Sequence, residues 1–280
     1  MIHNQRIIWS DDLTEKDLSV SLSDFLTSEE TIALVAADDY IFIGSDFPFN
    51  HKYFLVTSEN AGASVVTVEY WDGSNWREMI DVIDRTASSG VTLAQSGIMQ
   101  WRIDRDESGW ACEDKSSDLD GLSKRGMYDL FWLRFTFSGD VTADIKYVGH
   151  LFSNDTELYN RYPDLNRANL KTAFAAGKTT WLDQHLTAAE EIIADLRRRN
   201  IIASSGQIMS HELFKTAAIH KTAELIFAGM GRSYDEDRKK ARKYYDESMN
   251  MGGYFEVDKN ATGDLSRGEK LYNSTGYMTR

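Results

Sequence analysis

Oxygen-bearing side chains near the end of the chain follow the spacing of a calcium-binding loop. The ligand positions of an EF-hand loop are matched by Asp258, Asn260, Thr262, Asp264 and Glu269, with a glycine at the sharp turn. Ca²⁺ prefers such hard oxygen ligands, and a closing glutamate can supply two of them. A turn rich in Asn, Asp and Gly explains the same residues, because the preceding YFEV has the composition of a strand. Calcium binding is therefore one of two interpretations, and no other cofactor is expected.

The familiar catalytic motifs do not occur in the sequence. There is no GxxxxGK(S/T) phosphate loop, no GxSxG nucleophile elbow, no HExxH and no CxxC. His185 falls on the apolar stripe of a predicted helix, where a hydrogen-bonded core histidine is more common than a ligand. His211 and His220 share another predicted helix but not one face of it. These observations favour a protein that is not an enzyme.

A dense cluster of positive charge lies in the last third of the chain. It consists of Arg238, Lys239, Lys240, Arg242 and Lys243. Runs of this kind are most often solvated helix faces that pair with nearby acids such as Asp235 and Glu236. Contact with an acidic partner surface, or with DNA phosphates in a channel, are the alternatives.

Negative charge is concentrated in the first half of the sequence. Residues 1–150 carry 12 Lys and Arg against 26 Asp and Glu, whereas residues 151–280 carry 19 against 18. The two halves thus have net charges of −14 and +1, which account for the −13 of the chain. Because phosphates would be repelled by the first half, we do not expect that half to grip nucleic acid.

The single cysteine and the hydropathy pattern bear on the compartment. With only Cys112, the chain cannot form an internal disulfide, which fits a reducing compartment. Neither a secretory signal nor an apolar run near the ~20 residues needed to span a bilayer is visible. We therefore expect a protein that is made in the cytoplasm and does not enter a membrane.

Residues 1–150 have the pattern of an antiparallel β-sandwich. Aromatic and branched residues alternate with polar ones between Gly, Asn and Asp turns, and Asp72–Gly73 suits a tight hairpin. The expected strands are Ile32–Val35, Tyr40–Ile43, Tyr53–Val56, Val65–Trp71, Ile98–Ile103, Leu130–Ser138 and Thr142–Val148. Short strands at this spacing predict a jelly-roll-like domain.

Aromatic residues mark the two faces of one expected strand. Phe131, Leu133, Phe135 and Phe137 share one face, and Trp132 points to the other. The tryptophans of this half are expected to pack in the core or at a subunit interface. The alternative is a sugar-binding platform made by Trp71, Trp76 or Trp110.

Residues 151–252 change to a helical period and predict a small α-helical bundle. One helix is expected from Thr179 to about Asn200, with a stripe of Trp181, His185, Ala189, Ile192 and Leu196. A second spans Gln207–Met230 with Phe214, Ala218, Leu225 and Ala228 inward, and Ser233 caps a third, Tyr234–Met251. Residues 253–280 are polar and Gly-rich and predict a hairpin or extended arm. The whole is an α+β protein of two domains followed by an arm.

Two parts of the chain resemble structural proteins of tailed bacteriophages. YIFIGSDFPFNHKYFLV, VEYWDGSNWREM and TLAQSGIMQW are similar to a β-sandwich found in such proteins. The helical part, from TWLDQHLTAAEEIIADLRRRNII to ARKYYDESMNMGGYFEVDKNATGDLSRGEK, resembles their head–tail adaptors, also called connector or head-completion proteins. The sandwich departs from the minimal, all-helical adaptor.

The resemblance implies a virion protein of the head–tail neck that is assembled in the host cytoplasm. Such a protein forms a ring, typically of twelve copies, between the portal and a tail-side neck or terminator protein, and lets DNA pass without reading its sequence. The C-terminal arm would contact the portal through Tyr254, Phe255, Tyr272, Tyr277 and Arg280. The alternative is a glycan- or receptor-binding protein of the tail or baseplate.

Overall fold

The computed structural model describes residues 5–11, 14–26, 29–36, 38–102, 109–112, 130–250 and 257–258. These residues form an α+β structure with two antiparallel sheets and five α-helices. They group into two compact units. Unit 1 holds the described residues up to Gly149 together with Ser204–Met209 and Asp258, and unit 2 holds the remainder. The short segment Ser204–Met209, which the sequence places within the helical region, thus belongs to unit 1.

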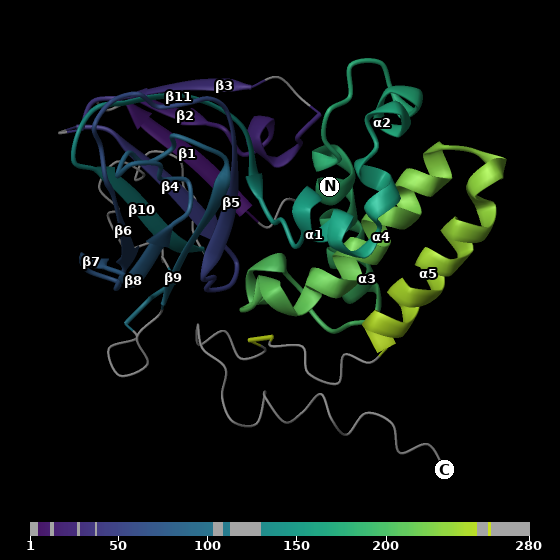
Figure 1. Ribbon diagram of the computed structural model, residues 1–280. Helices are drawn as coiled ribbons and strands as arrows, with labels where there is room; N and C mark the ends of the chain where they lie inside the picture. Colours follow the sequence, from purple (N-terminus) through teal and green to yellow (C-terminus); the bar gives the residue numbers. More distant parts are fainter. Residues whose placement is uncertain are drawn as a thin grey trace, which may run out of the picture. The chain divides into compact units, whose positions relative to one another are not determined.

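Unit 1 contains both sheets, and all strand pairs in them are antiparallel (Figure 1). The six-stranded sheet has the order β2 (Thr14–Asp17), β1 (Gln5–Asp11), β4 (Tyr40–Ser45), β10 (Phe131–Phe137), β6 (Val66–Trp71) and β7 (Trp76–Glu78). The five-stranded sheet has the order β3 (Glu30–Leu34), β11 (Val141–Gly149), β5 (His51–Ser58), β9 (Gly97–Arg102) and β8 (Ile80–Asp84). From β3 onward the chain alternates between the sheets, with only β6–β7 and β8–β9 adjacent in one sheet.

The two sheets share one hydrophobic core. Ile43 and Phe135 of the six-stranded sheet belong to the same buried cluster as Phe54, Met99 and Ile145 of the five-stranded sheet. Alternation along each strand directs every second side chain into this core. Burial of these side chains is the main stabilising contribution in unit 1.

The strands expected from the sequence are confirmed. They correspond to β3, β4, β5, β6, β9, β10 and β11. The predicted hairpin at Asp72–Gly73 is also present, because Trp71 pairs with Trp76 and Gly73 has a φ of 94°. Sequence reasoning missed β1, β2 and β8. The charged β2 pairs only with β1 at the sheet edge, so its residues carry little apolar pattern.

β10 places apolar side chains on both of its faces, as expected. Leu133, Phe135 and Phe137 enter the core between the sheets, and Trp132 lies in a second cluster on the other face of the six-stranded sheet. The buried members of that cluster are Ile8, Phe42, Trp71 and Trp132, with Tyr40, Trp76 and Leu130 packed against them. Burial of Trp71, Trp101, Trp110 and Trp132 agrees with the expected packing role.

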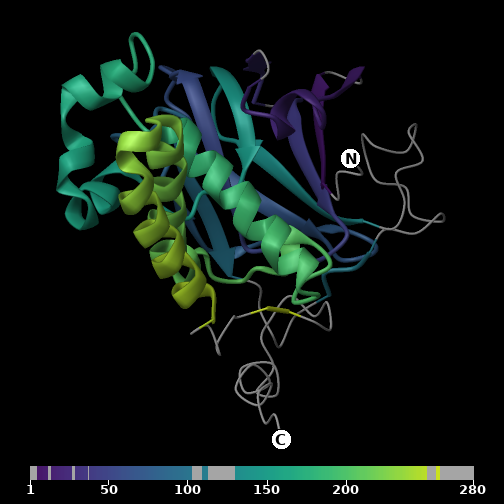
Figure 2. The same cartoon turned by 90° about the vertical axis from the view of Figure 1, so that its right-hand side faces the viewer.

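Unit 2 contains the five α-helices. They are α1 (Asp155–Arg161), α2 (Ala168–Phe174), α3 (Leu182–Arg198), α4 (Lys215–Gly229) and α5 (Asp235–Asn250). The stripe from Trp181 to Leu196 is buried at every predicted position. In Figure 2, α4 (green) and α5 (yellow-green) lie side by side. No helix among the described residues is long and apolar enough to cross a membrane.

The predicted helix Gln207–Met230 is wrong in its beginning and in part of its inward face. α4 begins at Lys215, because Ser204 caps a separate 3₁₀ turn and another turn precedes the helix. Ala228 is exposed and Leu225 is only half-buried. The buried face runs through Ala218, Thr222 and Ile226, at steps of four residues. Leu225 and Ile226 are both apolar, so hydrophobicity alone did not show that Ile226 is the buried one of the two.

Gly44 is required by the ring of Trp132. A Cβ at this position would lie 2.8 Å from three carbons of that ring, which is fully buried and cannot move aside. We expect Gly44→Ala to lower the free energy of unfolding by about 1–3 kcal/mol, as overpacking does elsewhere. Urea denaturation measures the loss. In a Trp132→Phe background the same change should cost less, and an equal cost in both backgrounds would contradict the steric explanation.

Candidate functional site

Most of the predicted C-terminal site residues lie outside the described part of the chain. These are Tyr254, Phe255, Tyr272, Tyr277 and Arg280 for portal contact, and Asn260, Thr262, Asp264 and Glu269 for calcium. Asp258 is described and fully buried, and its backbone exchanges hydrogen bonds with Gln207. Among the described residues no cluster of three or more His, Cys, Asp or Glu side chains has the arrangement of a metal site.

The predicted basic run lies on α5, and most of it is paired locally. Its ion pairs are Lys239–Glu236 at 2.8 Å, Arg242–Glu224 at 3.2 Å, Arg242–Asp246 at 3.3 Å and Lys243–Glu247 at 3.8 Å. Most of the side chains involved are exposed, Glu224 at 15% being the exception, so these pairs contribute little to stability. Arg238 and Lys240 make no ion pair within the described residues. The paired cations correspond to the solvated face that the sequence favoured.

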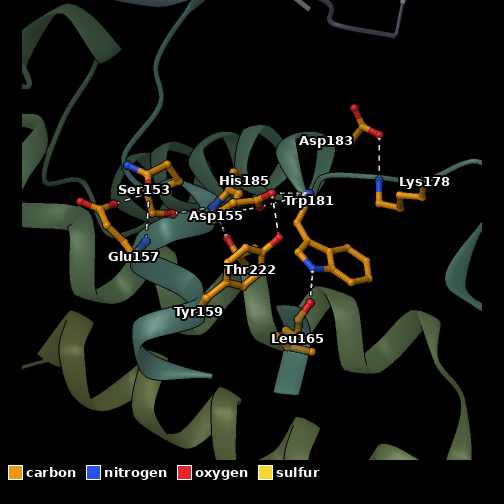
Figure 3. A network of polar contacts seen from close by, with 11 residues as sticks. Ser153, Asp155, Glu157, Tyr159, Leu165, Lys178, Trp181, Asp183, His185 and Thr222 are labelled. Carbon is orange, nitrogen blue, oxygen red and sulfur yellow. Dashed lines mark hydrogen bonds and ion pairs between the residues drawn. The ribbon is translucent and has the colours of Figure 1, made fainter. Parts of the chain in front are cut away.

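A polar network at the centre of unit 2 joins three helices (Figure 3). His185 of α3 lies with Nδ1 2.8 Å from Ser153 Oγ and 3.2 Å from Thr222 Oγ1 of α4, and with Nε2 3.2 Å from Asp155 Oδ1 of α1. Both ring nitrogens are satisfied when Nε2 carries the proton and donates to Asp155, while Nδ1 accepts from Ser153. The prediction of a hydrogen-bonded core histidine is confirmed.

The network contains serine, histidine and aspartate, but its geometry differs from that of a nucleophilic triad. In such triads Nε2 faces the serine and Nδ1 faces the carboxylate, whereas the ring of His185 is reversed. Ser153 is 4% exposed and His185 is 1% exposed. A hydroxyl enclosed in this way cannot meet a substrate without opening the helices, and the contacts instead tie α1, α3 and α4 together.

Asp155 accepts most of the hydrogen bonds in this network. Its carboxylate receives the Tyr159 hydroxyl at 2.9 Å and the Trp181 backbone N–H at 3.1 Å, in addition to His185. Burial alone would raise the pKa of Asp155, but these donors more than compensate and hold it below its ordinary value. The charged carboxylate is therefore the form that stabilises the packing of α1 against α3.

A cavity of about 470 Å³ lies beside this network, within unit 2. Its walls come from the end of α1, the turn after it, α2, the last turn of α4, the turn before α5 and α5 itself. The residues that define it are Arg161, Tyr162, Phe227, Tyr234, Lys240 and Tyr244. We name it the Tyr244 pocket. The volume falls in the range of ligand-binding cavities, ≈ 300–1,000 Å³.

Aromatic rings form the floor of the Tyr244 pocket. The Phe227 and Tyr234 rings are stacked with centroids 5.9 Å apart, and Tyr162 meets Phe227 edge-on at 6.1 Å. Behind them the Tyr162 hydroxyl lies 2.7 Å from Nδ1 of His220. Burial, aided by the charge of Arg161, lowers the pKa of His220 to about 4. The imidazole is thus neutral at physiological pH, so its Nδ1 can accept a hydrogen bond from the Tyr162 hydroxyl.

Two cations stand over the ring of Tyr244. The guanidinium of Arg161 and Nζ of Lys240 are each 6.0 Å from its centroid, at the outer limit of a cation–π contact. Neither has an ion pair within the described residues. The sequence marked Lys240 as part of a basic run, but it carried no signal for Arg161 or for the aromatic floor. Arg161 and Tyr244 are 83 positions apart in the chain, and the pocket residues meet only through helix packing.

No protein-family model matches the chain, and comparison with curated proteins and with solved structures gives no match. Functional inference therefore depends on the residues described above.

The Asp155 carboxylate should contribute to stability in a pH-dependent manner. We expect Asp155→Asn to lower the free energy of unfolding by about 1–3 kcal/mol, because charge-assisted hydrogen bonds are lost. Since the folded pKa lies below the ordinary value of 3.8, the contribution is fully present above that pH and disappears as pH falls through the folded pKa. Denaturation between pH 2 and 7 should show a shallower acid loss in the variant.

Asp183→Asn is the matched control for this experiment. Asp183 lies at the start of α3, as Asp155 lies at the start of α1, but its side chain is 61% exposed and within the described residues forms an ion pair with Lys178 alone. We expect this control to resemble the wild type at every pH. Equal effects of the two substitutions would show that Asp155 has no special role.

Ser153 should not behave as an activated nucleophile. A fluorophosphonate probe, which labels catalytic serines, is expected to leave the native chain unlabelled because Ser153 Oγ is enclosed and held by His185. Ser153→Ala should instead lower stability by about 1 kcal/mol, the usual value of one hydrogen bond. Labelling that disappears in Ser153→Ala would overturn the structural interpretation of the network.

Proposed function

We propose that the chain is a non-enzymatic structural protein of a tailed-bacteriophage virion, which forms a closed ring at the head–tail connection. In this proposal units 1 and 2 are two domains, a jelly-roll β-sandwich and a helical adaptor domain. The ring contacts the portal on one side and a tail-side neck or terminator protein on the other. Its role is geometric, since repeated head-to-tail contacts fix the copy number and rotation closes the ring.

The observation that carries the proposal is the strand order of unit 1. The orders β3-β11-β5-β9 and β4-β10-β6-β7 are those of a jelly roll, in which consecutive strands alternate between two sheets. β1 and β2 extend one edge, and β8 extends the other sheet. Viral capsid proteins and lectins use this architecture. It supports a virion role together with the adaptor-like sequence of the helical part.

The arrangement of polar groups in unit 2 is consistent with this role. The constellation of Ser153, His185 and Asp155 among its described residues is enclosed and serves helix packing. The exposed features are a charged helix face on α5 and the Tyr244 pocket, which suit contacts between proteins. The net charge of −14 on residues 1–150 would allow DNA to pass without adhering to that half of the chain.

Native mass spectrometry and negative-stain imaging test the ring directly. We expect the purified chain, mixed with a candidate portal protein from the same genome, to give closed rings of about twelve copies that co-sediment with the portal. Removal of residues 253–280 should abolish docking while leaving the circular dichroism of the remainder intact. A chain that stays monomeric with every portal tested, at micromolar concentration, would contradict the proposal.

A second function, glycan binding by the six-stranded sheet, is favoured by one observation. Among the described residues, the indole N–H groups of Trp9, Trp71, Trp76 and Trp132 are enclosed and have no hydrogen-bond acceptor. A sugar hydroxyl could accept from them only after the side chains around them opened. Against this, Trp71 and Trp110 are buried, so only Trp76 of the three proposed platform residues presents appreciable surface. Saturable binding on a glycan array that Trp76→Ala removes, by a chain that forms no rings, would favour this alternative.

A further inference from the structure

We propose that the Tyr244 pocket docks an acidic segment of a partner protein. An aromatic or aliphatic side chain of the segment enters the pocket, and a neighbouring carboxylate lies between Arg161 and Lys240. This inference names a binding site and the chemistry of its ligand, and it does not require that the chain form rings.

The first argument is that Lys240 differs from the paired cations of α5 and that, unlike Arg238, which is also unpaired within the described residues, it lines the pocket. Lys239, Arg242 and Lys243 each have a carboxylate partner on α5 or α4. Lys240 has none within the described residues, and instead shares the ring of Tyr244 with Arg161. Arg161 and Lys240 thus make no ion pair within the described residues, although Asp164 and Asp237 also line the pocket. A carboxylate supplied by a ligand would pair with these two cations.

The second argument is the apolar interior beneath these cations. Phe227 is buried, Tyr162 and Tyr234 line the same space, and Leu165 and Leu170 complete the wall. The Tyr162 hydroxyl forms a hydrogen bond with neutral His220, so neither group is left without a partner. An aromatic or aliphatic side chain would therefore bury its surface against the rings of Tyr162, Phe227 and Tyr234 without desolvating the paired Tyr162 hydroxyl.

The third argument concerns the charge of the ligand. Asp164 and Asp237 also line the pocket, so its cations face carboxylates nearby. Asp164 is held by Arg167 at 2.5 Å, but Asp237 has no ion pair within the described residues. With Asp164 paired to Arg167, the charges of Arg161, Lys240 and Asp237 leave the pocket a net +1, which one carboxylate balances and a phosphate dianion exceeds. A peptide backbone can donate an N–H to Asp237.

The fourth argument is that the walls are fixed before any ligand arrives. The indole N–H of Trp181 donates to Leu165 O at 2.9 Å, which holds the turn after α1 against the start of α3. The Asp155 network fixes α1 itself. A pocket that is ordered in advance loses little conformational entropy on binding. A single aromatic or aliphatic side chain can then contribute usefully to affinity.

NMR titration of the full chain with short acidic peptides tests the proposal. The probe is N-acetyl-Glu-Phe-Glu-amide, compared with N-acetyl-Glu-Ala-Glu-amide, N-acetyl-Lys-Phe-Lys-amide and adenosine monophosphate. We expect saturable changes in the amide signals of Tyr162, Phe227 and Tyr244 with the first probe only. Lys240→Gln and Arg161→Gln should each weaken its binding about five- to tenfold, as loss of one charge-assisted contact predicts.

Lys243→Gln is the matched control, since this exposed lysine lies on the same helix but does not line the pocket. It should bind the probe as the wild type does. Absence of saturable changes up to millimolar peptide would overturn the proposal, as would equal binding of the lysine peptide. Tighter, Lys240-dependent binding of adenosine monophosphate would replace it with a nucleotide site. If the chain forms rings but its pocket binds none of the probes, this inference is wrong and the proposed function is unaffected.

Discussion

The charged carboxylate of Asp155 is the interaction on which the helical unit depends. It accepts from Tyr159 on its own helix, from the backbone of Trp181 where α3 begins, and from His185 one turn further along. His185 carries the connection to Thr222 on α4. Because low dielectric strengthens satisfied polar contacts and penalises unsatisfied ones, this network selects one packing of the helices. The walls of the Tyr244 pocket follow from that packing.

Sequence periodicity predicted those features that depend on local pattern. The stripe from Trp181 to Leu196 and the two faces of β10 follow directly from helical and strand spacing. His185 was assigned to the core because it falls on that stripe. The start of α4 was misplaced, because two separate 3₁₀ turns precede the helix and the hydrophobic pattern does not mark where they end. The strand β2 was missed because its residues are charged or polar and have no apolar alternation.

The candidate site could not be predicted from the sequence, because it forms between elements. Arg161 ends α1, Lys240 and Tyr244 lie on α5, and Phe227 lies in the last turn of α4. The basic run drew attention to α5 as a whole, yet only Lys240 of its members lines the pocket, while Lys239, Arg242 and Lys243 are paired. Only the packing shows which lysine faces the pocket without an ion pair among the described residues. The distinction between a solvated face and a binding site therefore rests on neighbours far away in the chain.

A cryo-EM reconstruction of the assembled particle, with this chain labelled, tests the central claim most directly. Assembly around an axis predicts density for a coaxial ring at the neck, into which units 1 and 2 of each copy can be fitted. Neighbouring copies should be related by rotation about the channel. Copies that sit off the axis at a fibre tip, or a particle without the chain, would contradict the account.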